Sequence, residues 1–202
     1  MKKLLPALAK LLLALGFVGF AGGGLIGTGA FDYDGELPLS DIKGFVVDDN
    51  GHVYVGLGFY GMIQAYDANG KFIKNWRVKA VGGTFTIQLT EDHRIFVQTA
   101  RGNNKLWFNR DGNIVAEEVR HTKYAEIDSR WDSYTSEAGV KYAVKGGMFP
   151  RIENSTHEKV IVSQGILFHM LKGPFPAWLF IALGTGLRFW LAKEERELHL
   201  KR

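Results

Sequence analysis

The sequence contains no cysteine in its 202 residues. This excludes disulfide bonds and thiol chemistry, so a folded domain of this chain depends on the apolar surface that it buries. The six histidines form neither an H-E-x-x-H pattern nor a pair four residues apart, and no G-x-S-x-G motif occurs. The local patterns of a zinc-binding helix face and of a serine hydrolase are therefore missing. We predict no catalytic residue, no metal ligand and no cofactor.

Excess positive charge is lacking from the centre of the chain, although the whole sequence carries a formal net charge of +4. Residues 31–172 hold 17 basic and 18 acidic side chains, which gives a net charge of −1. The basic surplus therefore lies at the two ends of the chain, and no basic stripe remains for a nucleic-acid groove. We expect no nucleic-acid partner.

Two long apolar segments lie at the ends of the chain. The run Leu11–Phe31 has no charged residue, follows three lysines and precedes an acidic segment. The second segment extends from Pro174 to Ala192, contains Arg188 and is followed by a basic tail. About 20 apolar residues span a bilayer as a helix, and lysine and arginine concentrate on the cytoplasmic side. We therefore expect a cell-membrane protein with both termini in the cytoplasm.

These segments divide the chain into four predicted parts. They are a transmembrane anchor or signal segment (1–31), an extracytoplasmic β-repeat domain (32–172), a transmembrane helix (173–192) and a basic cytoplasmic tail (193–202). A cleaved signal peptide is the alternative to the first anchor, because Thr28-Gly29-Ala30 offers small residues at the two positions that signal peptidase reads. In either case the central domain is exported.

Three glycines recur at four-residue spacing in the first apolar segment. Gly19, Gly23 and Gly27 would share one face of a helix, where a second helix can approach closely. We predict that they are helix-packing residues.

An internal repeat occupies the central domain. Residues 45–74 and 87–116 align without a gap at an offset of 42 residues, so that Gly70 falls on Gly112. Each copy alternates β-branched or aromatic residues and is divided by turn signals such as Asn-Gly and Asp-Gly, which favour tight β-hairpins. Four short strands in about 40 to 45 residues is the spacing of a propeller blade.

The repeat resembles the NHL repeat, a family of propeller blades. Residues 102–113 match its glycine-asparagine loop, alternating strand and Asp-Gly turn, and residues 46–55 match its other half. The resemblance covers about residues 42–119. A third, degenerate unit is predicted from strands at Val140–Val144 and Lys159–Val162, with the 42-residue register lost and the loop Gly146–Pro150 intervening. Family propellers carry about six blades, so the resemblance implies an incomplete ring.

We therefore predict a mainly β protein of antiparallel four-stranded blade-like repeats, forming a partial propeller or an open β meander, flanked by N- and C-terminal transmembrane helices. An open stack of blades leaves an edge strand unpaired and an apolar face uncovered. The third unit and its neighbours cap the stack, or several chains complete the ring, or a partner protein covers it. We favour capping.

Two patterns that suggest ligand sites have a structural interpretation. The run Gly56–Gly61 matches G-x-G-x-x-G, but no helix follows to hold a pyrophosphate, so we predict a loop between blade strands. The carboxylates of Asp32–Glu36 lack the rest of a calcium loop. We interpret them as a solvated segment outside the membrane.

Loops on one face of a propeller-like domain commonly bind partners. Phe59 and Tyr60 lie in a glycine-flanked loop, and Arg101, Asn103 and Asn104 lie at the corresponding loop of the second copy. We predict that these five residues form a binding surface.

The sequence favours a binding module over an enzyme. We predict a membrane-tethered extracytoplasmic binding or scaffolding module, an accessory component of a membrane complex, whose partners are the membrane and either another protein or a second copy of the chain. The alternative is a lactonase-type hydrolase, which would need a closed propeller around a central metal.

Overall fold

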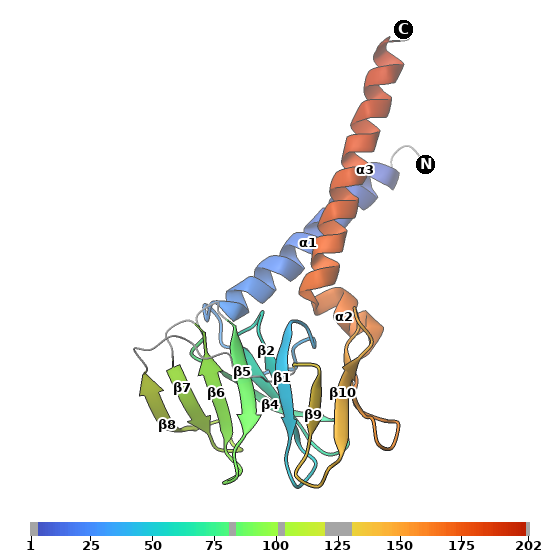
Figure 1. Ribbon diagram of the computed structural model, residues 1–202. Helices are drawn as coiled ribbons and strands as arrows, with labels where there is room; N and C mark the ends of the chain where they lie inside the picture. The colour runs from blue at the N-terminus through green and yellow to red at the C-terminus, as the bar shows by residue number, and fades with distance from the viewer. Residues whose placement is uncertain (1–3, 81–83, 101–103, 120–130, 201–202) are drawn as a thin grey trace.

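The computed structural model describes residues 4–80, 84–100, 104–119 and 131–200. In these residues twelve strands form three antiparallel four-stranded sheets, and three helices lie at the ends of the chain (Figure 1). Each sheet takes four consecutive strands, which is the construction of a propeller blade. The prediction of a mainly β protein with blade-like sheets is confirmed.

Sheet A contains β1 (Ile42–Val47), β2 (Val53–Leu57), β3 (Met62–Tyr66) and β4 (Phe72–Arg77). Sheet B contains β5 (Phe85–Leu89), β6 (Ile95–Thr99), β7 (Asn104–Phe108) and β8 (Ile114–Val119). Sheet C contains β9 (Ser133–Thr135), β10 (Lys141–Lys145), β11 (Arg151–Asn154) and β12 (Lys159–Val162). The helices are α1 (Leu4–Gly27), α2 (Ile166–Lys172) and α3 (Pro174–Leu200).

The first turn of every sheet has the same side-chain chemistry. An oxygen of Asp48, Thr90 or Ser136 accepts a hydrogen bond from the backbone N–H four residues later. Such bonds are typical of aspartate, threonine and serine in tight turns. The three positions are separated by 42 and 46 residues, so sheet C repeats the unit at a longer offset.

The offset of 46 residues agrees with the prediction that the 42-residue register is lost in the third unit, and it provides a longer register in its place. It places β6 on β10 and β8 on β12, so strands predicted at Val140–Val144 and Lys159–Val162 are confirmed. The loop Gly146–Pro150 does not interrupt the unit; it is the β10–β11 connection, equivalent to the β2–β3 loop. The extra residues fall between the second and third sheets, because β8 ends at Val119 and β9 begins at Ser133.

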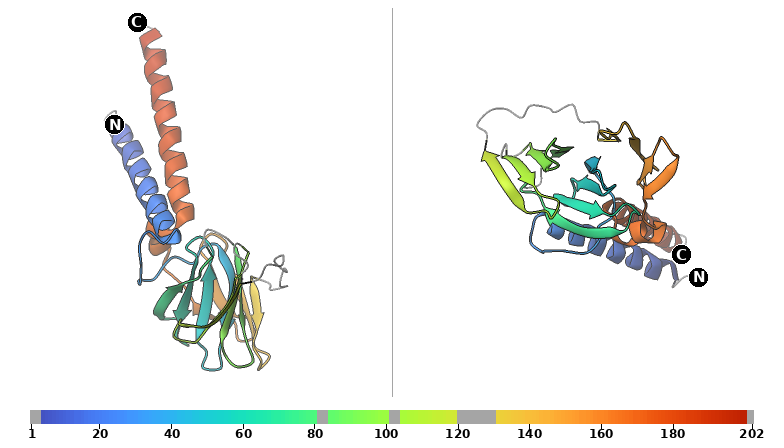
Figure 2. Two further views of the ribbon diagram at one scale, coloured as in Figure 1. Left: turned by 90° about the vertical axis from the view of Figure 1, so that its left-hand side faces the viewer. Right: turned by 90° about the horizontal axis from the view of Figure 1, so that it is seen from below.

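Sheet A lies between the other two sheets. Because alternate residues of a strand face opposite sides, Val46 and Tyr54 pack with the residues of sheet B, whereas Phe45 and Val55 pack with Ile152 and its neighbours in sheet C. Both β2 and β3 are buried along their whole length. The right-hand view of Figure 2 shows the order B, A, C in space, which differs from the order along the chain.

Equivalent turn glycines make both of these sheet contacts. A Cβ on Gly112, in the β7–β8 turn of sheet B, would lie 2.6 Å from the Trp76 ring in β4. A Cβ on Gly70, in the β3–β4 turn of sheet A, would collide with the carbonyl oxygen of Ile161 in β12. Sheet A therefore packs on sheet C as sheet B packs on sheet A. Sheet C therefore lies on the side of sheet A opposite to sheet B. This is the position that the last blade of a ring takes beside the first blade.

The outer face of sheet C is polar. Lys141, Lys145, Arg151 and Glu153 point away from sheet A, because their neighbours along the strands pack against it. A polar outer face is what the terminal unit of a repeat stack requires. This surface supports the capping arrangement.

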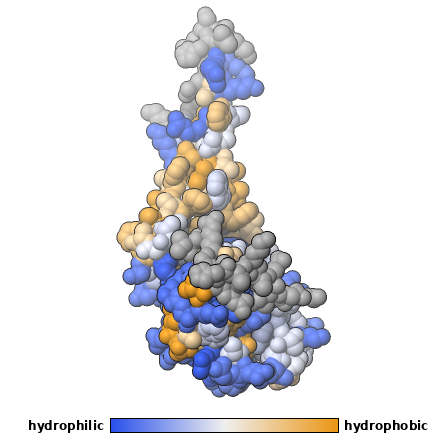
Figure 3. Space-filling model, turned by 60° about the vertical axis from the view of Figure 1, so that its left-hand side comes forward, coloured by the Kyte–Doolittle hydropathy of each residue, from blue (hydrophilic) through white to orange (hydrophobic). Residues whose placement is uncertain are grey.

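Helices α1 and α3 pack against each other on one end of the β domain, and both chain termini lie at their far end (Figure 1). Among the described residues, α1 and the part Pro174–Glu194 of α3 are the two helices that are long and apolar enough to cross a membrane. Their exposed apolar side chains form a band above the domain (Figure 3). Helix α3 continues to Leu200, so the predicted tail is helical over most of its length.

We expect Gly70→Ala to destabilise the protein more than Gly139→Ala. Gly70 has φ +77° and Gly139 has φ +76°. An alanine in this left-handed conformation lowers the free energy of unfolding by about 1–2 kcal/mol. A Cβ at position 139 has open space, whereas one at position 70 meets the backbone of β12, which adds roughly 1–3 kcal/mol. Unfolding of the full-length variants in detergent micelles, followed by circular dichroism, measures the difference. Equal losses would contradict the packing of sheet A on sheet C.

Candidate functional site

The β2–β3 loop lies against the helices. Its turn closes through a hydrogen bond from the Gly61 N–H to the Gly58 carbonyl at 3.2 Å, with Gly61 at φ +60°. Tyr60 is buried, and its hydroxyl donates to the backbone oxygen of Lys172 at 3.4 Å. Burial raises the pKa of Tyr60, so the hydroxyl stays protonated. Tyr60, which we predicted to be part of a binding surface, therefore makes its contacts within the chain.

One face of α1 is shaped by glycines. A Cβ on Gly23 would lie 2.8 Å from the Phe59 ring, and one on Gly27 would lie 2.5 Å from the Phe59 carbonyl oxygen. A Cβ on Gly19 would lie 3.3 Å from the Cβ of Ala177 in α3. The predicted glycines thus divide between two neighbours, because the first contacts α3 and the other two contact the β2–β3 loop.

Gly16 extends this face, although sequence analysis did not single it out. A Cβ there would lie 2.7 Å from the Ala177 carbonyl oxygen and 2.9 Å from the backbone nitrogen of Ile181. Helix α1 and helix α3 are therefore in backbone-close contact. Gly16 lies three residues before Gly19, so a search for four-residue spacing misses it. Residues three or four apart share one face of a helix, and allowing both steps would have included Gly16.

Arg77 joins the end of α1 to sheet A. Its guanidinium donates to the carbonyl oxygens of Ile26 at 2.9 Å, Phe31 at 3.3 Å and Gly27 at 3.5 Å. The last carbonyls of a helix have no intrahelical donor, and a cation there also suits the helix dipole. Nothing in the sequence around Arg77 indicated this role, because its partners lie about 50 residues earlier in the chain.

Two glutamines fix the segment between α1 and β1. Gln64, fully buried in β3, accepts a hydrogen bond from the Leu37 N–H at 2.6 Å and donates to the Leu37 carbonyl at 2.9 Å. Gln164 accepts from the Leu39 N–H at 2.8 Å and donates to the Leu37 carbonyl at 2.8 Å. The buried side chains of both leucines fill the core between sheets A and C. This segment therefore connects the first helix, sheet A and the chain leading into α2.

Helix α2 contributes a buried histidine to the same end of the domain. The His169 ring lies 5.8 Å from the ring of Phe149 in the β10–β11 loop, and its Nε2 has no hydrogen-bond partner among the described residues. Burial lowers the pKa of His169, while the nearby Glu36 carboxylate opposes this shift. The imidazole is therefore neutral at pH 7.

The remaining predicted loop residues lie at the β6–β7 connection. Arg101 and Asn103 are outside the described residues. Asn104 begins β7, where its backbone N–H donates to the Thr99 hydroxyl at 3.1 Å.

Among the described residues, no helix lies at the opposite end of the β domain, which we call the distal end (Figure 1). The β1–β2 and β9–β10 turns there border a cleft of about 460 Å³. Its polar lining includes the exposed carboxylates of Asp49 and Glu137 and the half-buried rings of Tyr134 and Tyr142. Asp49 is paired within the fold, because its Oδ2 lies 3.1 Å from His93 Nδ1 and 3.7 Å from Arg110 Nη2. Glu137 is therefore the carboxylate that the cleft offers beside its aromatic surface.

Asp48, at the edge of this cleft, has a structural role. Its buried carboxylate accepts hydrogen bonds from the His52 N–H at 2.9 Å and from the Tyr54 hydroxyl at 3.2 Å, and Arg110 lies 3.5 Å away. Burial and the adjacent Asp48 charge raise the pKa of Tyr54. Because all of its neighbours are supplied by the fold, this carboxylate is committed to the turn.

In the part of the chain that the structure describes, no three histidine, aspartate or glutamate side chains come together as a metal site. The geometry therefore defines a β domain of three blade-like sheets, joined at one end to two apolar helices and open at the other.

No protein-family model matches the sequence, and neither does any curated protein. Among solved structures, the chain is similar to virginiamycin B lyase from Staphylococcus aureus, at 14% identity and a TM-score of 0.37, over 63% of this chain and 43% of that one. A streptogramin B lyase gives 11% identity and a TM-score of 0.38, over 64% and 42%. A protein of unknown function from Bacteroides caccae gives 14% identity and a TM-score of 0.32, over 63% and 51%.

The chain thus spans about half or less of the length of these structures. Likeness at this level assigns no activity.

We expect Gly27→Ala to loosen the attachment of α1, and Gly24→Ala to preserve it. Both glycines are in α1, but a Cβ at position 24 has open space whereas one at position 27 meets the Phe59 carbonyl. Gly24→Ala should raise stability by about 0.5–1 kcal/mol through helix propensity. Gly27→Ala should lower the melting temperature and speed protease cleavage after the helix. Matching behaviour of the two variants would rule out the contact with the β2–β3 loop.

The stability of the protein should fall as the pH is lowered below about 6.5, the ordinary histidine pKa. Because the folded-state pKa of His169 is lowered, the unfolded chain binds more protons between the two pKa values, and stability present above the unfolded pKa is lost through this window. Unfolding measured from pH 8 to pH 5 should show a shallower decline in His169→Gln than in the parent protein. An unchanged decline would show that His169 titrates normally.

Proposed function

We propose that the protein is a membrane-tethered extracytoplasmic binding or scaffolding module built from NHL-like repeats, and an accessory component of a membrane complex. The observation that carries this proposal is the junction between the helices and the β domain. Two helices apolar enough to cross a membrane pack together, and Phe59, Tyr60 and Arg77 attach them to one end of the domain. Such an anchor presents the domain at the membrane surface in one orientation.

The proposed orientation has both termini in the cytoplasm and the β domain outside. It is supported by the lysines that precede the first apolar segment and the basic residues that follow the second. Basic residues concentrate on the cytoplasmic side of membrane helices. The N-terminal end of α1 and the C-terminal end of α3 both point away from the β domain, and α3 extends further (Figure 1).

The proposed binding surface is the distal end. The helices cover the β2–β3 loop, whereas the cleft of about 460 Å³ is lined by the β1–β2 and β9–β10 turns. These turns lie at the end of the β domain away from the helices (Figure 1). The exposed Glu137 carboxylate of the cleft, beside two tyrosine rings, suits a cationic group on a protein partner or a small molecule. A partner of this kind would meet the module from the extracytoplasmic side.

The topology is tested by cysteine labelling, since the chain has no native cysteine to remove. We expect Ala138→Cys, at the rim of the distal cleft, to react with a membrane-impermeant maleimide in intact cells. Lys193→Cys, near the end of the second apolar segment, should react only after permeabilisation. Both side chains are exposed in the fold, so burial does not explain a difference. The reverse pattern would reject the extracytoplasmic location, and release of the protein by alkaline carbonate would reject the anchor.

A further inference from the structure

Helix α2 directs large apolar side chains outward. Ile166, Leu167 and Leu171 are 64%, 71% and 58% exposed. The opposite side of the helix is committed to the fold, because His169 is buried there. Apolar side chains on one side of a surface helix normally face the core, so this orientation is the reverse of the usual one.

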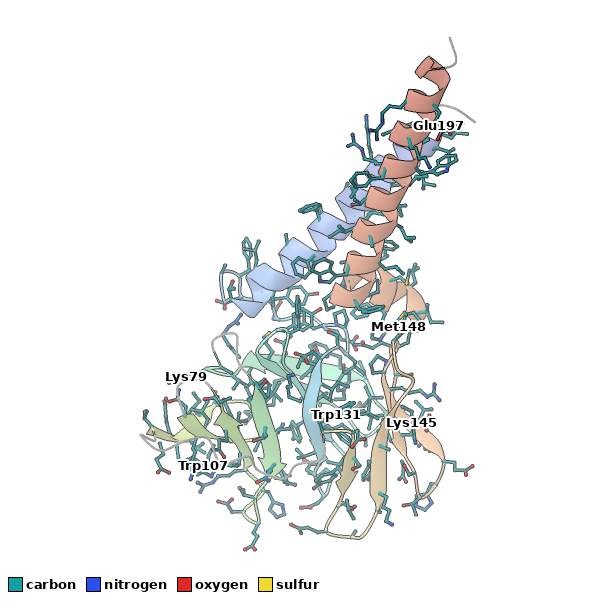
Figure 4. The ribbon with its side chains drawn as sticks, turned by 45° about the horizontal axis from the view of Figure 1, so that its top comes forward. Lys79, Trp107, Trp131, Lys145, Met148 and Glu197 are labelled. Atoms are coloured by element: carbon teal, nitrogen blue, oxygen red, sulfur yellow. The ribbon has the colours of Figure 1, made fainter. Side chains whose placement is uncertain are left out.

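The apolar surface continues beyond α2 on both sides. Met148, in the β10–β11 loop, lies beside α2 and is 50% exposed (Figure 4). Phe175 and Trp178, in the first turns of α3, are also exposed. The exposed apolar surface therefore continues from α2 to the first turns of α3, the helix that we propose to cross the membrane.

The position of α2 is fixed by backbone contacts. The Gly173 N–H donates to the His169 carbonyl at 2.7 Å, and a Cβ on Gly173 would lie 2.5 Å from that oxygen. The Tyr60 hydroxyl donates to the backbone carbonyl of Lys172, the last residue of α2. Helix α2 is therefore a separate helix that turns away from α3 at a tight corner and stays against the β domain.

A lipid bilayer is the occupant that this surface fits. Helices that lie in the membrane interface place apolar side chains toward the acyl chains and keep polar groups at the edge. Trp178 is an aromatic residue of the kind enriched at the interface. Lys172 is exposed at the end of α2, with its ammonium 4.8 Å from the centroid of the Phe168 ring and 3.3 Å from the Tyr33 hydroxyl, which leaves a cation beside the headgroups.

We propose that the outer side of α2, together with Met148, rests in the headgroup and outer acyl region of the bilayer that α1 and α3 cross. This proposal rests on the proposed membrane anchor and adds a second contact with lipid. The contact holds the end of the β domain that carries the β2–β3 and β10–β11 loops against the membrane. It keeps the distal cleft directed away from the lipid.

The test uses single cysteines labelled with an environment-sensitive nitrobenzoxadiazole dye. Leu167→Cys and Leu171→Cys probe α2, Val18→Cys is the reference within the bilayer, and Val160→Cys is the reference on the outer face of sheet C. Each full-length variant is reconstituted into phosphatidylcholine vesicles with or without lipid brominated on its acyl chains. Melting temperatures in micelles establish that the labelled proteins are folded.

We expect brominated lipid to reduce the emission at positions 167 and 171 by roughly a half, as for a group held about 5–10 Å below the interface. The emission at position 18 should be quenched as well, and that at position 160 should not change. Quenching at 18 without quenching at 167 and 171 would overturn the proposal while leaving the anchor intact. A blue-shifted but unquenched signal at 167 would also overturn it, because protein would then cover α2. No quenching at 18 would reject the anchor itself.

Discussion

The burial of sheet A on both faces is the constraint on which the rest of the structure depends. Among the described residues, sheet A places fully buried side chains in both cores, whereas the fully buried residues of sheet B lie in one core and those of sheet C in the other. The strands of sheet A therefore contain consecutive buried residues, as in Val53-Tyr54-Val55, where a sheet with one wet face would alternate. The two cores meet in this sheet, so a defect in β2 or β3 weakens contacts to both neighbours.

The attachment of the helices shows how small residues and a turn combine into a rigid joint. The glycines of α1 remove the side chains that would keep Phe59 away, and the β2–β3 loop fills the space. Arg77 donates to the carbonyls of Ile26 and Gly27 at the end of this helix. A flexible tether would need none of these contacts. The joint therefore restricts the domain to a narrow range of orientations relative to the helices.

Local chemistry made the strands, turns and apolar segments predictable from the sequence. Turn glycines such as Gly70 and Gly112 mark the hairpins because few other residues adopt a positive φ there. The order of the sheets in space was not predictable, since it depends on contacts between segments far apart in the chain. The same holds for Gln164, which bonds to Leu39 across 125 residues. Phe59 and Tyr60 stood out as aromatic loop residues, but the sequence did not reveal that the helices cover them.

The position of sheet C beside sheet A determines how the domain would carry mechanical load. Because the last sheet precedes the first in space, the chain enters and leaves the β domain at neighbouring points, where Gln164 bonds to the backbone of Leu39. Once the direct contact between α1 and α3 has parted, a force that separates the two helices passes through the hydrogen bonds of Gln164 to Leu37 and Leu39 and through the core between sheets A and C. Sheet B lies outside the direct path between the helices. The module would therefore yield first at its A–C seam, with sheets A and B still packed together.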